Sequence, residues 1–138
     1  MSHLVNIKTQ IKNMECVKRA AEYLAAQDNV QVTFIEGGTP RFWGGQQNRR
    51  ADYTLNLPGK YDLGFKQSAD GETYEFMCEA YLLTGQDRLG SQLIGHNGDR
   101  LLQEYAFQEI AYQHELRGES VERSVNASGE LVALAYVR

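Results

Sequence analysis

Apolar and polar residues alternate in three successive runs within residues 51–81. A side-chain period of two is typical of strands that bury one face of a sheet. Two turn sequences, Pro58-Gly59-Lys60 and Asp70-Gly71, separate the runs and favour reversal of the chain. The sequence therefore predicts three antiparallel strands in a row, with one apolar and one polar face.

The two turns also predict which residues lie opposite one another. A three-residue loop at Pro58-Gly59-Lys60 and a two-residue turn at Asp70-Gly71 keep the apolar residues on one face. The predicted pairs are Leu57 with Tyr61, Leu55 with Leu63, Tyr53 with Phe65, Phe65 with Phe76, and Leu63 with Cys78. On the polar face, this register places Lys66 between Asp52 and Glu75, and Asp62 between Asn56 and Glu79.

The carboxylates of Asp62 and Glu79 are the sharpest candidate for chemistry on this face, which we expect to be solvated. Adjacent carboxylates raise one another's proton affinity or bind a hard cation. Asn56 lies alongside in the predicted register, and Asp52 lies one row away. A weak divalent-cation site is one reading of this arrangement. The other is that both carboxylates point into water and repel each other only weakly.

The rest of the chain supplies helices and further strands. We expect an α+β fold: a mostly antiparallel sheet of about seven strands with two helices packed on one face, forming a ferredoxin-like core with an added hairpin. Apolar residues on both faces of the last strand favour an inner position in a sheet. The predicted segments are strands over residues 3–11, 30–35, 120–125 and 131–137, helices over 13–28 and 99–117, and irregular stretches over 36–50 and 84–97.

The first irregular stretch has the composition of a recognition loop. It contains four glycines and the only tryptophan, Trp43, together with Arg41, Arg49 and Arg50. Aromatic and arginine side chains are enriched where proteins bind an acidic protein, a phosphate or nucleic acid. The alternative is that the aromatic residues fold back onto the core while the arginines remain solvated.

Length and composition limit the class of protein. The 138 residues predict a single domain over 1–138, and no apolar run reaches the length of a membrane span. The first residues lack the layout of a secretory signal, and two cysteines outside any CxxC motif predict reduced thiols, so we expect a cytoplasmic protein. We predict no cofactor, metal site or catalytic residue, and a net charge of −4 disfavours nucleic acid as a partner.

Several short segments resemble a known family. The similarity extends over residues 1–4, 7–13, 43–46, 51–52, 61–65, 71–75 and 103–106, with the opening and the Tyr-Asp-Leu-Gly-Phe segment the most specific. These segments are similar to the hypothetical chloroplast open-reading-frame thirty-five family, a domain of unknown function found in cyanobacteria, plastids, other bacteria and some phages. The resemblance implies a small soluble protein and assigns it no activity.

Three functions are compatible with these observations. The first is a non-enzymatic binding or assembly module with a protein partner, which would use Arg41, Trp43, Arg49 and Arg50 and the polar face of the three strands. The second is an enzyme or a divalent-cation-dependent protein that uses Asp62 and Glu79. The third, with less support, is a protein that binds single-stranded nucleic acid through the same loop.

Overall fold

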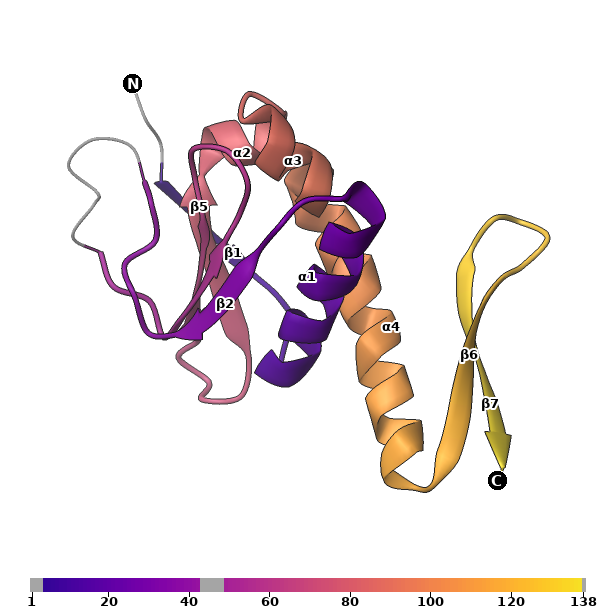
Figure 1. Cartoon of the computed structure of the whole chain (residues 1–138). Helices are drawn as coiled ribbons and strands as arrows, with labels where there is room; N and C mark the ends of the chain where they lie inside the picture. Colours follow the sequence, from indigo (N-terminus) through magenta and orange to yellow (C-terminus); the bar gives the residue numbers. More distant parts are fainter. Residues whose placement is uncertain (1–3, 43–48, 138) are drawn as a thin grey trace.

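The computed structural model describes residues 4–42 and 49–137, and it has the α+β composition that the sequence predicts. Figure 1 shows a sheet with helices on one side and a separate hairpin at the C-terminal end. In chain order the elements are β1 (Leu4–Lys8), α1 (Met14–Asp28), β2 (Thr33–Glu36), β3 (Tyr53–Asn56), β4 (Leu63–Gln67), β5 (Tyr74–Glu79), α2 (Ala80–Thr84), α3 (Arg88–Ile94), the 3-10 helix η2 (His96–Gly98), α4 (Asp99–Leu116), β6 (Glu119–Val125) and β7 (Leu131–Val137).

The described strands form two sheets, whereas a single sheet of about seven was predicted. Five strands pair in the order β1-β5-β4-β3-β2, and β6 and β7 form a two-stranded sheet of their own. All paired neighbours are antiparallel. A ferredoxin-like core has the element order β-α-β-β-α-β, but here four strands in succession, β2 to β5, separate the first helix from the next. The ferredoxin-like topology is therefore not confirmed.

The predicted register of the central strands is confirmed where the strands are paired. Tyr53 lies opposite Phe65, and Leu55 opposite Leu63. Phe65 in turn lies opposite Phe76, with Lys66 opposite Glu75. Alternation was sufficient to predict this register, because a shift of one residue would move every apolar side chain to the other face. The turn between β4 and β5 is not the predicted two-residue turn, since the Gly71 amide donates to the Ser68 carbonyl at 3.0 Å and the Ser68 amide donates to the Thr73 carbonyl at 2.8 Å.

The apolar face of the sheet packs against α1 and α4 and forms the main core. The side chains of Leu55, Leu63, Phe65 and Phe76 on this face are fully buried. Helix α1 begins at the predicted cap, since Asn13 accepts a hydrogen bond from the Glu15 amide at 3.0 Å. It buries one stripe of small and apolar residues against the sheet, namely Met14, Cys16, Val17, Ala20, Ala21, Leu24 and Ala25.

The opposite face of the sheet is covered in part, over Gly64 and Met77, which corrects the expectation that all of it is solvated, whereas Lys66 on the same face is exposed. Residues 37–42 and 49–52 lie on the other side of the sheet from the helices (Figure 1). Phe42 and Ala51 from this segment form a second small core with Met77 of β5. Gly64 makes the close approach possible, because a Cβ atom there would lie 2.9 Å from Pro40 Cγ and 3.1 Å from Ala51 Cβ.

Two other segments differ from the prediction. The stretch 84–97 is not irregular, because it contains α3 and η2, with Leu93 and Ile94 buried. Strand β7 is not an inner strand: within the described residues, β6 is its only hydrogen-bonded neighbour. The predicted helix over 99–117 corresponds closely to α4, and the predicted hairpin over 120–137 corresponds to β6 and β7. No helix in residues 4–42 or 49–137 has the length and hydropathy needed to cross a bilayer.

Candidate functional site

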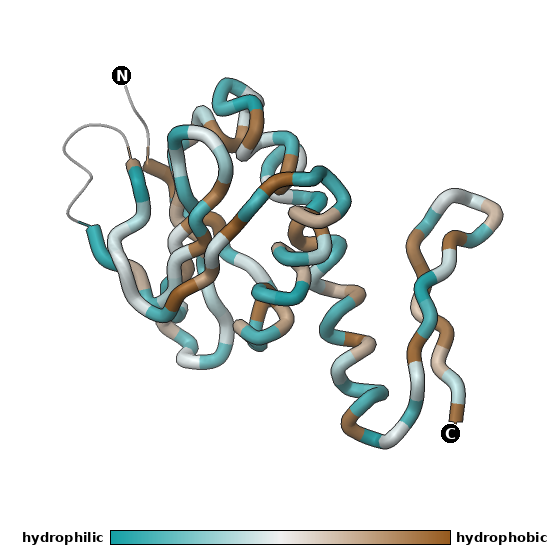
Figure 2. The backbone as a smooth tube through the Cα atoms, viewed as in Figure 1, coloured by the Kyte–Doolittle hydropathy of each residue, from teal (hydrophilic) through white to brown (hydrophobic). Residues whose placement is uncertain are grey.

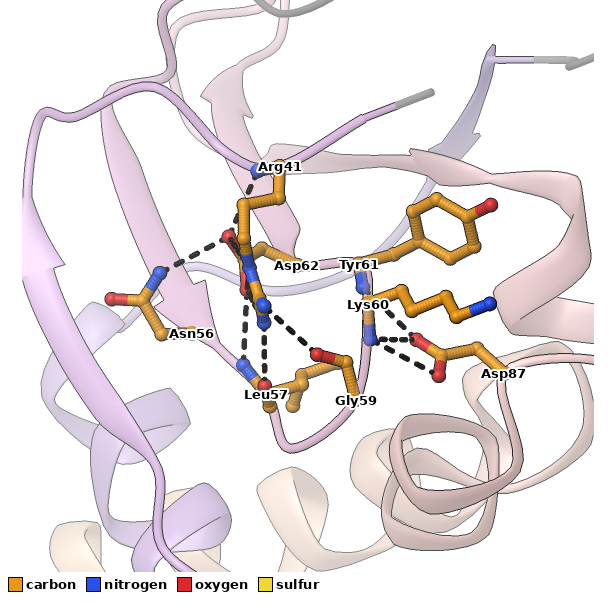
Figure 3. A network of polar contacts seen from close by, with 8 residues as sticks. All are labelled: Arg41, Asn56, Leu57, Gly59, Lys60, Tyr61, Asp62 and Asp87. Carbon is orange, nitrogen blue, oxygen red and sulfur yellow. Dashed lines mark hydrogen bonds and ion pairs between the residues drawn. The ribbon is translucent and has the colours of Figure 1, made fainter. Parts of the chain in front are cut away.

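The carboxylate of Asp62, just before β4, is fully buried and lies at the centre of a polar network (Figure 3). Its Oδ2 atom accepts hydrogen bonds from the Arg41 amide at 2.8 Å and from Asn56 Nδ2 at 3.1 Å. Its Oδ1 atom accepts from Arg41 Nη2 at 2.8 Å and from the Leu57 amide at 3.2 Å. Both oxygens therefore have several donors, as a buried carboxylate requires.

The guanidinium of Arg41 binds more than this carboxylate. Its Nη1 atom donates to the Gly59 carbonyl at 2.8 Å, and its Nη2 atom donates to the Leu57 carbonyl at 2.7 Å. The hydrogen bonds to Asp62 raise the pKa of Arg41 above its ordinary value. One side chain thus joins the loop of residues 37–42 to the turn between β3 and β4, using the fixed fork of donors that only arginine offers.

A second buried carboxylate, that of Asp87, holds the other side of the same turn. It accepts hydrogen bonds from the backbone amides of Lys60 and Tyr61, each at 3.0 Å to Oδ2. Gly59 lies beside it with φ +104°, and a Cβ atom at this position would lie 2.3 Å from Asp87 Oδ1. Sequence reasoning missed Asp87, because it lies in the segment that was predicted to be irregular. An acidic residue directly before the apolar spacing of α3 is the signal that could have found it.

Glu79, at the end of β5, is also fully buried. Gly64 lies opposite Met77, and two residues further along, the same register leads to Asp62 and Glu79 on one face of the sheet. The shared face was predicted correctly, but the exposure of the two carboxylates was not. Burial raises the pKa of the nearby Tyr61 phenol, and the negative charge of Glu79 raises it further.

The remaining predicted site residues lie apart from this buried network. Arg49 and Arg50 are exposed at the end of the loop, and Asp52 is exposed where the loop joins β3. The Asp52 carboxylate accepts a hydrogen bond from the Gln67 amide at 2.7 Å, which ties the loop to β4. Trp43 lies outside the described residues. Of the predicted set, the structure therefore brings together Arg41 and Asp62, on the same face as Glu79.

The hydrogen bonds of this network hold backbone segments of the chain itself in place. The lone pairs of Asp62 and Asp87 are directed at amide and guanidinium donors of the chain itself. Among the described residues there is no group of three His, Cys, Asp or Glu side chains placed to hold a metal ion. What these residues do is fix the positions of the loop that starts at residue 37 and of the turn at 57–61.

The two cysteines are structural core residues. Cys16 and Cys78 are free thiols with fully buried side chains. Burial raises the pKa of each thiol to about 12, and the charge of Glu109 near Cys16 and of Glu79 near Cys78 acts in the same direction. Because the thiolate is the reactive form, neither side chain has the environment of a nucleophile.

Comparison with known proteins does not assign this site. No protein family, curated protein or solved structure was found to match the chain.

Proposed function

We propose that this chain is a non-enzymatic binding or assembly module, which presents the loop of residues 41–50 to an acidic protein partner. The observation that carries the proposal is the anchoring of the loop by the ion pair between Arg41 and the buried Asp62. A loop held at its base on a rigid sheet loses less conformational entropy on binding than a free one.

The base of the loop is held by backbone contacts as well. The Gly37 amide donates to the Asp52 carbonyl at 2.6 Å, and the Ala51 amide donates to the Gly38 carbonyl at 3.0 Å. Phe42 on one side and Ala51 on the other are buried against the sheet. These contacts fix where the chain leaves the sheet and where it returns, so that the residues between them are presented from a defined base.

The charged residues of the loop divide into two roles. Arg41 is committed to Asp62, whereas Arg49 and Arg50 are exposed and available to a partner. Guanidinium groups recognise carboxylates through paired hydrogen bonds, and Trp43 of the sequence would add apolar contact area. This combination favours an acidic peptide or protein surface as the ligand.

The two other functions receive less support from the geometry. The cation-dependent reading needs Asp62 as a ligand, but its oxygens already accept hydrogen bonds from Arg41, Asn56 and Leu57. The nucleic-acid reading needs a basic groove that tracks a backbone, and the chain carries a net charge of −4. The resemblance to the chloroplast open-reading-frame thirty-five family remains a proposal and adds no activity.

The fluorescence of Trp43, the only tryptophan, provides a direct test. We expect a saturable change on titration with poly-glutamate, and roughly tenfold weaker binding by the Arg49→Ala/Arg50→Ala variant, since each exposed contact is worth about 0.2–1 kcal/mol. Lys18→Ala/Arg88→Ala removes the same charge from exposed helix positions and serves as the control. Equal affinities of the two variants would contradict a role of the loop in binding.

The same titration tests the nucleic-acid function, which stronger binding of a single-stranded oligonucleotide than of poly-glutamate would favour. Calorimetry with Mg²⁺ tests the cation-dependent function.

A further inference from the structure

A hollow of about 280 Å³ lies between α2 and α3. One wall follows a single face of α3, where Arg88, Ser91 and Gln92 have helical spacing, and His96 closes the far end. Residues 83–85, at the end of α2, form the other wall. Figure 1 shows both helices directly after β5 and away from the hairpin of β6 and β7. In Figure 2, hydrophilic positions at the junction of the two helices lie next to hydrophobic positions within them.

The two helices that form the hollow are fixed to each other. The buried Ser91 hydroxyl donates a hydrogen bond to the Leu82 carbonyl at 2.5 Å. Gly90 permits close packing, because a Cβ atom there would lie 2.8 Å from Leu82 Cδ1 and 3.2 Å from the Pro58 carbonyl oxygen. The hollow is therefore preformed by the fold, as small-molecule sites usually are.

The hollow is lined by basic residues and by no acidic ones within the described part of the chain. Its titratable residues are Arg88 and His96, both of which are exposed. In residues 4–42 and 49–137, Arg88 forms neither an ion pair nor a hydrogen bond. It differs in this from the arginines that each pair with a carboxylate, namely Arg19, Arg41, Arg100, Arg117 and Arg123. The guanidinium of Arg88 is therefore available to an anion from solution.

The donors around the hollow indicate which anion fits. Arg88 has a fork of N–H donors, and the Gln92 amide and the His96 imidazole add further N–H groups. A phosphoryl group carries a charge of about −1.5 to −2 at pH 7 and three acceptor oxygens, whereas a carboxylate has one charge and two oxygens. The buried side chain of Leu83 offers an apolar surface beside these donors. The volume is at the lower end of the range for ligand sites, which favours a short carbon chain.

We propose that the hollow between α2 and α3 binds a small phosphate monoester. Arg88, Gln92 and His96 donate to the phosphoryl oxygens, and the carbon chain lies against Leu83. This inference is independent of the loop function proposed above, because none of these residues belongs to the loop.

The first test uses propyl phosphate as the probe, titrated into the ¹⁵N-labelled full chain and followed by two-dimensional NMR. We expect saturable shifts of backbone amides within residues 83–96, with a dissociation constant in the millimolar range, because the contacts are few and partly exposed. Butyrate has a similar carbon chain but carries a carboxylate, and it should bind at least about fivefold more weakly. Shifts that do not saturate, or equal binding of butyrate, contradict a phosphate site.

Two positions test the residues and the space separately. Arg88→Ala should weaken the binding of propyl phosphate roughly tenfold, and Arg88→Lys should recover part of the loss, since lysine keeps the charge but lacks the fork. Gln92→Trp fills the hollow from an exposed helix position without a change of charge and should also abolish binding. Unchanged affinity in Arg88→Ala or in Gln92→Trp overturns the proposal.

The two double variants of the loop experiment separate this site from the loop. Arg49→Ala/Arg50→Ala should bind propyl phosphate as the wild type does, whereas Lys18→Ala/Arg88→Ala should lose propyl phosphate and keep poly-glutamate. Both variants remove the same charge, so an equal loss of propyl phosphate in the two would show a response to net charge alone and would overturn the site. A wild-type chain that binds propyl phosphate but not poly-glutamate would contradict the loop function and support this site.

Discussion

Arg41 and Asp62 form an ion pair in which the two side chains have unequal exposure. The side chain of Arg41 is 48% exposed, whereas that of Asp62 is fully buried. Removing Arg41 and removing Asp62 therefore have different effects on stability. A guanidinium left without its carboxylate can be rehydrated, whereas a buried carboxylate left without its guanidinium cannot. The stability of the loop base depends mainly on the supply of donors to the carboxylate.

The corresponding prediction concerns Arg41→Ala. This change leaves the buried Asp62 charge without its guanidinium, so we expect a loss of about 2–4 kcal/mol in the free energy of unfolding. The measurement is urea denaturation followed by circular dichroism. Arg50→Ala, an exposed arginine of the same loop, is the control and should change stability by less than about 0.5 kcal/mol. Similar losses for both arginines would show that the network does not stabilise the fold.

Gly59 provides a second prediction for a single residue. Its φ is +104°, and a Cβ atom added there would lie 2.3 Å from Asp87 Oδ1. The change Gly59→Ala therefore adds backbone strain and displaces the Asp87 carboxylate. We expect a loss of about 3 kcal/mol in the free energy of unfolding. Gly71→Ala, at φ +74° with open space around it, carries only the backbone strain and should cost about 1 kcal/mol. Equal shifts of the two urea midpoints would contradict a role for Asp87.

Residue patterns predicted which way side chains point but not what covers them. Alternation placed Asp62 and Glu79 on one face correctly, and the structure shows that this face is buried at both positions. The missing information was the return of the loop across the sheet. Gly64 was a usable signal, because a glycine within a strand often marks the close approach of another segment, here Pro40 and Ala51.

Among the secondary-structure elements, the junction between α4 and the hairpin depends on Arg123. Its guanidinium forms two parallel hydrogen bonds with Glu104 and is sandwiched between two aromatic rings. Lysine keeps the charge but has neither the fork nor the flat surface. The hairpin therefore depends on the shape of this side chain as well as on its charge.

We expect Arg123→Lys to release the hairpin without unfolding the main sheet. Amide hydrogens of β6 and β7 should exchange about tenfold faster, while those of β4 and β5 keep their protection. Hydrogen exchange with mass spectrometry measures both regions in one experiment. Arg117→Lys is the control, because Arg117 is 60% exposed and contacts Glu119 outside the stack. Uniformly faster exchange in all four strands would mean that the hairpin and the sheet unfold together.

Elements with strong local signals were predicted well, and those with weak ones were not. Helix α1 has an Asn cap and a clear apolar stripe, and both were found. Helix α3 has a glycine in its interior, Gly90, and only seven residues, so its period is barely visible in the sequence. Strand β7 was predicted from its composition to be an inner strand, but within the described residues it pairs with β6 alone.

For the molecule as a whole, the topology depends on which strands pair with one another. The sequence predicts strand pairs that are neighbours along the chain, such as β3 with β4, because a short turn forces them together. It does not show that β1 pairs with β5, since about seventy residues separate them and many placements satisfy the same alternation. The division of the seven described strands into two sheets is a long-range property of this kind.

Two buried thiols lower the stability of the entire fold as the pH rises through the alkaline range. The pKa of Cys16 and that of Cys78 are raised to about 12 in the folded chain, whereas an exposed thiol titrates near 8.5. Below about pH 8.5 both states hold the protons and the thiols contribute no pH dependence. Between about pH 9 and 12 the unfolded chain releases protons that the folded chain retains, so stability falls as the pH rises.

We therefore expect the free energy of unfolding to decrease above about pH 9, with each thiol contributing a slope that approaches about 1.4 kcal/mol per pH unit. Buried tyrosines such as Tyr105 have a raised pKa and add to the decrease, so the thiol contribution must be isolated by substitution. Cys78→Ala should be less stable at about pH 7 but should lose stability more slowly between about pH 9 and 10.5. Val17→Ala, also a fully buried position, should keep the full wild-type slope. Urea midpoints at several pH values measure both slopes, and identical slopes for the two variants would mean that Cys78 is not protected from ionisation by the fold.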